Sequence, residues 1–262
     1  MTVFILVMIL ISVPAYLLWE GRNLRRVDAG RPRWRRWLRA LIAVVIGFAL
    51  LKHAFILYSV IRIEHNNPST TALMDQRARE SGAPRREWTW VNYEQISPNL
   101  VRAVVAGEDP RFATHSGIDW REVQRAIDVS MVERRVVRGA STISQQLVKN
   151  LYLSTSRNPV RKFHEMIIAL ELERTLSKRR IMELYLNVAE WGDEIYGIEA
   201  AAHHYFNTTA SSLTMDQAAF LTAILPAPRA KYDLNDLPIR TRDQIQVVLE
   251  NMRNVQLPAE LA

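Results

Sequence analysis

The sequence predicts a mainly α-helical protein with one or two membrane-spanning helices at its amino terminus. Two long apolar segments lie within the first 61 residues, and from Ser97 onward apolar residues recur at helical spacing. No run of alternating polar and apolar residues, the pattern of a half-buried strand, interrupts that spacing. The length of 262 residues allows one substantial domain or two small ones.

The basic charge of the chain is concentrated at its amino terminus. Residues 1–57 hold nine of the 34 Lys and Arg residues but only two of the 27 acidic residues, which accounts for the whole net charge of +7. The neutral remainder argues against a nucleic-acid-binding domain, whose affinity depends on neutralising phosphates. The absence of cysteine excludes disulfides, thiol nucleophiles and Cys-ligated metal sites.

The two apolar segments predict membrane spans at residues 3–19 and 40–61. The second is interrupted only by Lys52 and His53, and both approach or reach the length of about 17 to 25 residues that crosses a bilayer. The loop between them, 20–39, holds eight arginines, so the positive-inside rule places this loop in the cytoplasm. Everything after about residue 62 is then expected on the other side of the membrane. A single span, with the first segment at the membrane interface, is the alternative.

Residues 62–96 are polar and contain turn-forming Asn, Pro and Gly, which predicts a membrane-proximal linker. The helical domain is predicted over 97–262. Two apolar stripes at helical spacing lie in it: Phe163, Met166, Ile167 and Leu170, then Ile181, Leu184, Tyr185 and Val188. Thr214 and Gln217 have the spacing of a capping box, which predicts a helix start before the next apolar run.

Adjacent carboxylates open the first motif of the domain, GEDPRFATHSGID. Glu108 and Asp109 follow an apolar, helix-like stretch and precede Pro110, so we expect an acidic group where a helix ends. Alone, this pattern is typical of a solvated turn.

Hydroxyl and amide side chains gather in the second motif, GASTISQQLVKN. Thr142 and Gln145 have capping-box spacing, which would satisfy backbone donors at a helix start. The same groups at a helix start also suit a phosphate or a sugar. Spacing alone leaves both interpretations open.

Two further motifs, RKFHE and KRRIMELYLN, carry charged residues on predicted helices. Arg161 and Glu165 are four residues apart, so a helix-surface salt bridge worth about 0.2 to 0.5 kcal/mol is the simplest interpretation. Glu183 belongs to a charged helix face above an apolar stripe.

Together, in this order and spacing, these motifs resemble the family 51 glycosyltransferases, the peptidoglycan glycosyltransferases that polymerise lipid II. AEWGDEIYGIEAAAHHYF and LTMDQAAFLTAILPAP extend the resemblance over half of the chain. The short remainder leaves no room for a transpeptidase domain, so the monofunctional biosynthetic transglycosylases of the family are the nearest match. They typically have one amino-terminal anchor, which makes the segment 3–19 additional.

The resemblance implies a lysozyme-like bundle in two lobes with a cleft between them. It implies transfer of the growing glycan from its lipid pyrophosphate to the 4-hydroxyl of lipid II, with inversion, formation of a β-1,4 bond and release of undecaprenyl diphosphate. Lipid II, the lipid-linked glycan and the bilayer are therefore the expected partners. The expected location is the bacterial inner membrane, with the catalytic domain in the periplasm; proteins of cell-wall synthesis or division are further candidate partners.

The resemblance also assigns residues. Glu108 is the expected general base, and Glu165 is the expected second catalytic glutamate. Glu165 would either orient the pyrophosphate through Mg²⁺ or Mn²⁺ or hold basic side chains in place. The resemblance does not make a metal cofactor a firm requirement. The expected substrate-binding residues are Ser141, Thr142, Gln145, Gln146, Lys149, Asn150, Arg157, Arg161 and Lys162. Supporting structural positions are expected at Asp109, Phe112, His115 and Glu183.

Two other functions are alternatives to glycan polymerisation. A lysozyme-like lytic enzyme would cleave a neutral glycosidic bond and would not need the cation cluster of Lys149, Arg157, Arg161 and Lys162. A catalytically silent membrane scaffold would not need Glu108 and Glu165.

Overall fold

In the computed structural model the chain is mainly α-helical, as predicted. The structure describes residues 33–82, 88–133, 141–156 and 158–261, so the predicted span at 3–19 lies outside the described residues. The chain forms two units, Met1–Ile61 and Arg62–Ala262. The α-helices of the described part are α2 (Arg33–Arg62), α3 (Ala72–Ser81), α4 (Pro98–Glu108), α5 (Trp120–Glu133), α6 (Ile143–Tyr152), α7 (Pro159–Thr175), α8 (Lys178–Val188), α9 (Ile198–Phe206), α10 (Met215–Ile224) and α11 (Ile239–Asn254).

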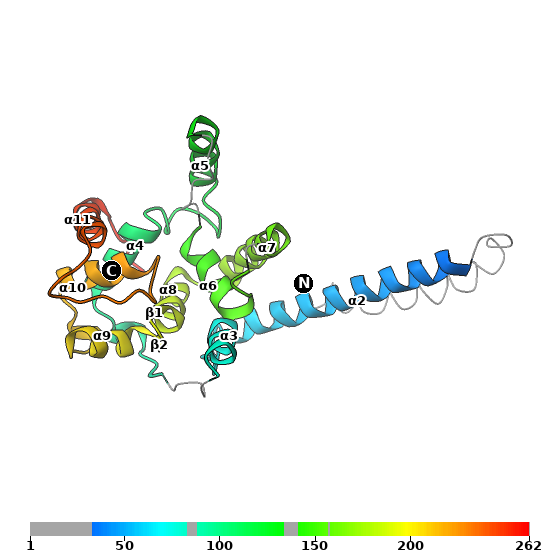
Figure 1. Cartoon of the computed structure of the whole chain (residues 1–262), viewed down its shortest axis with the longest axis horizontal. Helices are drawn as coiled ribbons and strands as arrows, with labels where there is room; N and C mark the ends of the chain where they lie inside the picture. Colours follow the sequence, from blue (N-terminus) through cyan, green and yellow to red (C-terminus); the bar gives the residue numbers. More distant parts are fainter. Residues whose placement is uncertain (1–32, 83–87, 134–140, 157, 262) are drawn as a thin grey trace. The chain divides into compact units, whose positions relative to one another are not determined.

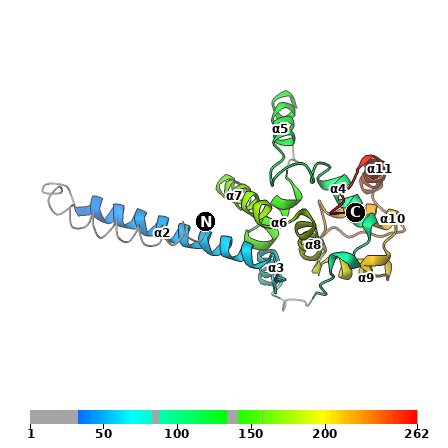
Figure 2. The same ribbon diagram turned by 180° about the vertical axis from the view of Figure 1, so that it is seen from behind.

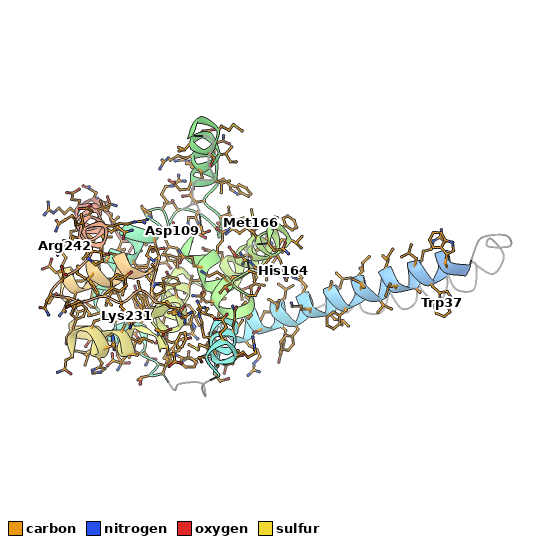
Figure 3. The ribbon with its side chains drawn as sticks, in the orientation of Figure 1. Trp37, Asp109, His164, Met166, Lys231 and Arg242 are labelled. Carbon is orange, nitrogen blue, oxygen red and sulfur yellow. The ribbon has the colours of Figure 1, made fainter. Side chains whose placement is uncertain are left out.

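Helix α2 contains a segment that is long and apolar enough to cross a membrane. Trp37–Arg62 has 26 residues, and its most apolar window of 18 residues has a mean hydropathy of 2.4. Side chains project outward along the helix, Trp37 among them (Figure 3), and Val44 and Phe48 are largely exposed. The helix also includes residues 33–39, which the sequence assigned to the basic loop, because arginine is a good helix former.

Two groups of helices build the second unit. Helices α4, α10 and α11 pack against one another, and α6 packs against α3, α7 and α8. The grouping is the same in both views (Figures 1 and 2). Buried aliphatic and aromatic side chains, including Leu147 and Tyr185, fill the core. The predicted two-lobed helical domain is therefore confirmed.

Local sequence signals fix several helix starts. Thr142 and Thr214 both form complete capping boxes, with Gln145 and Gln217 as their partners, so both predicted helix starts are confirmed. The predicted apolar stripe of α8 is fully buried.

Helix α7 buries a different face from the apolar stripe found in the sequence. Phe163 is 64% exposed, whereas Glu165, Ile168 and Leu172 are buried. The carboxylate of Glu165 can be buried because Arg161 and Lys162 both pair with it. A search for apolar residues at helical spacing does not detect such a buried charge.

The segment 62–96, predicted as a linker, contains structure of its own. Helix α3 starts at Thr71, whose hydroxyl accepts a hydrogen bond from the Met74 amide, and packs on α6. A 3₁₀ turn, η1 (Tyr93–Gln95), follows, and a second one, η2 (Ala210–Ser212), lies after α9.

A short antiparallel hairpin interrupts the helices. It pairs β1 (Glu190–Gly192) with β2 (Ile195–Tyr196). Strands of two or three residues are too short to produce the alternation by which a strand is predicted.

Candidate active site

The two groups of helices enclose a pocket of about 840 Å³. Its wall is built by α4, α6, α7, α10 and α11. The predicted site residues that line it are Glu108, Ser141, Gln146, Lys149, Arg161, Lys162 and Glu165. A carboxylate from α4 and basic side chains from α6 and α7, far apart in the sequence, thus face one cavity.

Glu108 is the last residue of α4, and close helix packing sets its position. A Cβ atom on the preceding Gly107 would lie 2.5 Å from Thr222 Cγ2 of α10. The Gln146 side chain donates a hydrogen bond to Glu108, with 2.7 Å between Nε2 and Oε2. Burial raises the pKa of Glu108, while this hydrogen bond and the charge of Lys149 oppose the rise. A raised pKa makes the carboxylate a better proton acceptor.

The other residues of the first motif join α4 to α6. Asp109 is buried at the end of α4 (Figure 3) and accepts hydrogen bonds from the Ile143 amide at 3.0 Å and from His115 Nε2 at 2.9 Å. The Phe112 ring is buried, with the Lys178 ammonium 4.4 Å from its centroid. Asp109, Phe112 and His115 do not line the pocket. Asp109, which follows Glu108 in the chain, joins the end of α4 to the start of α6.

A cluster of cations surrounds Glu165 in the pocket. Arg161 donates to Glu165 Oε2 at 2.6 Å, and Lys162 pairs with Oε1 and also donates to Ser141 at 2.9 Å. Glu165 itself is 2% exposed. Burial lowers the pKa of Lys149, which lines the same pocket, and the neighbouring Arg161 and Lys162 add to the effect against the pull of Glu165. With three cations close to one buried carboxylate, the cluster favours an anionic ligand.

The structure places Thr142 and Gln145 in the cap at the start of α6. Both are buried within the capping box, and the Thr142 hydroxyl donates to the Gly117 carbonyl at 2.7 Å. Neither lines the pocket. Of the two interpretations open from the sequence, helix capping therefore describes their position.

Two further predicted residues lie outside the main pocket. Asn150 lines a neighbouring cavity of about 340 Å³, which shares Gln146 and Lys149 with the main pocket. Glu183 accepts hydrogen bonds from Trp90 and Arg180 at 3.2 and 3.0 Å and does not line the pocket. Arg157 lies outside the described residues.

Sequence reasoning missed several polar residues of the site, Tyr185 and Arg240 among them; Tyr232, Thr241 and Gln244 also line the pocket. Tyr185 donates to Gln146 at 3.0 Å, but the sequence placed it only in an apolar stripe. Arg240 of α11 adds a cation to the pocket wall. No local signal marks Arg240, because its position depends on how α11 packs against α4 and α10.

The described residues do not fit a metal site built by protein groups alone. Within the described ranges, no three His, Asp or Glu side chains form a group that could hold a metal ion. Both carboxylate oxygens of Glu165 already contact Arg161 and Lys162.

Comparison with known proteins places this site in a family. A family model described as Transglycosylase matches residues 75–253, a range that includes the lining carboxylates and cations named above. The chain belongs to the transglycosylase family. The match spans both groups of helices, so the pocket lies wholly within the transglycosylase domain.

Curated relatives are similar over most of their length. Each is named biosynthetic peptidoglycan transglycosylase. The protein from Laribacter hongkongensis is 40% identical over 85% of this chain and 99% of its own. The protein from Nitrosomonas eutropha is 41% identical over 85% of this chain and 92% of its own length. The protein from Alcanivorax borkumensis is 44% identical over 86% of this chain and 90% of its own length.

Proposed function

We infer that this chain is a peptidoglycan glycosyltransferase that polymerises lipid II into β-1,4-linked glycan strands. The observation that carries the inference is one pocket in which Glu108 faces Lys149, Arg161 and Lys162. A base for a sugar hydroxyl and cations for a pyrophosphate are what this transfer requires.

The reaction is a single displacement with inversion. Glu108 accepts the proton of the acceptor 4-hydroxyl as its oxygen forms a bond to the anomeric carbon of the donor sugar. The bond from that carbon to the pyrophosphate oxygen breaks, and the lipid diphosphate leaves with the bonding electrons. The α linkage of the donor becomes a β linkage, and no covalent enzyme intermediate is needed.

The cations act on the leaving group. Arg161 can bind phosphate oxygens through two N–H groups, and Lys149 and Lys162 add compact charges. Glu165 is the positioning residue of this cluster, because its buried carboxylate contacts both Arg161 and Lys162. Charge placed in advance around the departing pyrophosphate stabilises the transition state without reorganisation.

The membrane helix supports the same function. Both substrates carry polyprenyl chains that stay in the bilayer, so an enzyme anchored in that bilayer meets them at high effective concentration. We propose that the anchor lies in the inner membrane, with the catalytic domain in the periplasm. Proteins of cell-wall synthesis or division are proposed as further partners.

The function is tested by incubating the full-length protein with lipid II in detergent or vesicles. We expect glycan polymer from the wild type, inhibition by moenomycin, and no polymer from Glu108→Gln at unchanged thermal stability. Glu171→Gln is the matched control, since that carboxylate pairs with Arg174 away from the pocket. Wild-type yield from Glu108→Gln contradicts the base assignment, and cleavage of preformed glycan without polymerisation favours the lytic enzyme.

The orientation is tested separately. The chain has no cysteine, so Ser211→Cys introduces one thiol at an exposed position of the domain. A membrane-impermeant maleimide added to intact cells with a permeabilised outer membrane should label it. Labelling only after the inner membrane is broken would place the domain in the cytoplasm.

A further inference from the structure

A chain of two hydrogen bonds links Tyr185 to the catalytic carboxylate. The Tyr185 hydroxyl donates to Gln146 Oε1 at 3.0 Å, and Gln146 Nε2 donates to Glu108 Oε2 at 2.7 Å. The three residues come from α8, α6 and α4. Tyr185 is 1% exposed, so its hydroxyl is held in place by the core.

The two ends of the Gln146 amide are not equivalent. An ionised carboxylate can only accept hydrogen bonds, so Glu108 requires the NH₂ end of the amide. The Tyr185 hydroxyl supplies a donor to the oxygen at the other end. Turning the amide over would bring two acceptors together at Glu108 and leave the hydroxyl proton of Tyr185 without its present acceptor.

Tyr185 remains a donor throughout the working pH range. Burial, with the charges of Glu108 and Asp109, raises the pKa of Tyr185 well above its ordinary value. The ring alone would satisfy the apolar stripe of α8, which a phenylalanine would also fill. The hydroxyl is therefore the part of this side chain that acts on the site.

We propose that Tyr185 is a positioning residue, whose hydroxyl fixes the Gln146 amide with its NH₂ group toward Glu108 and so orients the carboxylate toward the acceptor hydroxyl. This proposal rests on the proposed function, in which Glu108 is the base. It also gives Gln146 a role in the free enzyme, in addition to any contact with the sugar.

The pH response of Glu108 reports on this hydrogen bond. The charged or titratable groups around the pocket, besides Glu108 itself, are Asp109 on the α4 side, Lys149 of α6, Arg161, Lys162 and Glu165 of α7, Tyr185 of α8, Tyr232 in the segment before α11, and Arg240 of α11. Tyr185→Phe changes the charge of none of them at neutral pH. Since the Gln146 hydrogen bond lowers the pKa of Glu108, its loss moves the acid limb of activity to higher pH.

The test compares full-length wild type, Tyr185→Phe, Gln146→Leu and the double variant in lipid II polymerisation across pH. We expect the acid limb of kcat/KM to rise by about one pH unit in each single variant, a tenfold effect on the ionisation equilibrium. The double variant should show no further shift, because both substitutions remove one hydrogen-bond chain. Tyr93→Phe is the matched control, since that buried hydroxyl donates to the Leu261 carbonyl and leaves the profile unchanged.

A second readout does not depend on catalysis. Carbon-13 NMR of labelled glutamate carboxyls, with Glu108 assigned from Glu108→Gln, should show its titration midpoint raised in Tyr185→Phe and in Gln146→Leu. If Tyr185→Phe folds but neither the titration midpoint of Glu108 nor the acid limb of activity shifts, the proposal is overturned. If Tyr185→Phe does not fold, the same two measurements on Gln146→Leu decide, and unshifted values there also overturn the proposal. Wild-type protein that makes no polymer refutes the proposed function instead, and the NMR midpoint still decides the positioning role.

Discussion

Glu108 and Lys149 are opposite charges held in one pocket, and burial shifts the pKa of each toward neutrality. The pKa of Glu108 is raised and that of Lys149 is lowered, in both cases chiefly by removal from water. A base is useful when ionised and a phosphate-binding lysine when protonated. For the proposed reaction we therefore expect the working pH range to lie between the pKa of Glu108 and the pKa of Lys149.

We predict a bell-shaped pH dependence of kcat/KM. Activity should rise with pH through a value above the ordinary range of a glutamate, as Glu108 ionises, and fall through a value below the ordinary range of a lysine, as Lys149 loses its charge. Lys149→Arg should move the basic limb upward, since arginine stays protonated. Polymerisation rates measured across pH check both limbs; a basic limb unchanged in Lys149→Arg would show that another group sets it.

Arg161 should matter for the reaction more than for folding. Arg161→Ala removes a charged hydrogen bond to the leaving group, so we expect kcat/KM to fall by about tenfold or more. Lys162 continues to pair with Glu165, which limits the loss of thermal stability. Arg174→Ala on the same helix, where the arginine pairs with Glu171, is the control. If Arg161→Ala unfolds the protein, the salt bridge with Glu165 is structural.

At the scale of elements, the loop after α4 holds α6 and α7 together. Gly117 has a φ of +90°, and a Cβ there would lie 2.7 Å from the Ala169 carbonyl oxygen of α7. Its own carbonyl accepts the Thr142 hydroxyl at the start of α6. The position thus requires both a left-handed backbone and the absence of a side chain.

Gly117→Ala should strongly destabilise the domain. Backbone strain alone costs about 1 to 3 kcal/mol, and the clash with Ala169 adds to it. Gly82→Ala is a matched control, because Gly82 also has a positive φ, +66°, but no atom lies within 4 Å of its added Cβ. Thermal unfolding of the full-length variants in detergent measures the difference, and equal losses would mean that strain, not contact with α7, dominates.

At the scale of the molecule, the protein combines a lipid-facing helix with a domain that acts on lipid-linked substrates. The segment Trp37–Arg62 is apolar apart from Arg39, Lys52, His53 and Arg62 and a few uncharged polar residues. Exposing so many apolar side chains to water is unfavourable, and a lipid bilayer would remove all of them from water. The anchor therefore restricts the search for substrate to a surface.

Val45→Arg should weaken membrane retention. An arginine near the middle of a spanning helix costs about 2.5 to 3.5 kcal/mol on insertion scales. Val45 is exposed within the apolar segment, so the change meets lipid directly. Carbonate extraction of membranes measures the bound fraction, with Val45→Leu as the conservative control. Unchanged retention of Val45→Arg would indicate that other parts of the chain hold the protein to the membrane.

The amino-acid sequence is enough to predict the helical class, the apolar segment of α2 and the capping boxes at Thr142 and Thr214. These features depend on composition or on contacts between residues three or four apart, which local spacing records. Local spacing did not single out Glu108, since its motif alone is typical of a solvated turn; the expected role came from the resemblance of the ordered motifs to a known family.

Which side chains contact one another in the pocket can be seen only in the folded domain. Glu108 and Gln146 are 38 residues apart and Tyr185 lies a further 39 from Gln146, so their contact follows from the packing of three helices. The same packing buries Glu165 on α7 and places Arg240 at the pocket. It also packs α3, a helix within the predicted linker, against α6. Contacts across such distances depend on how all the helices fill space together, and no local pattern of residues encodes them.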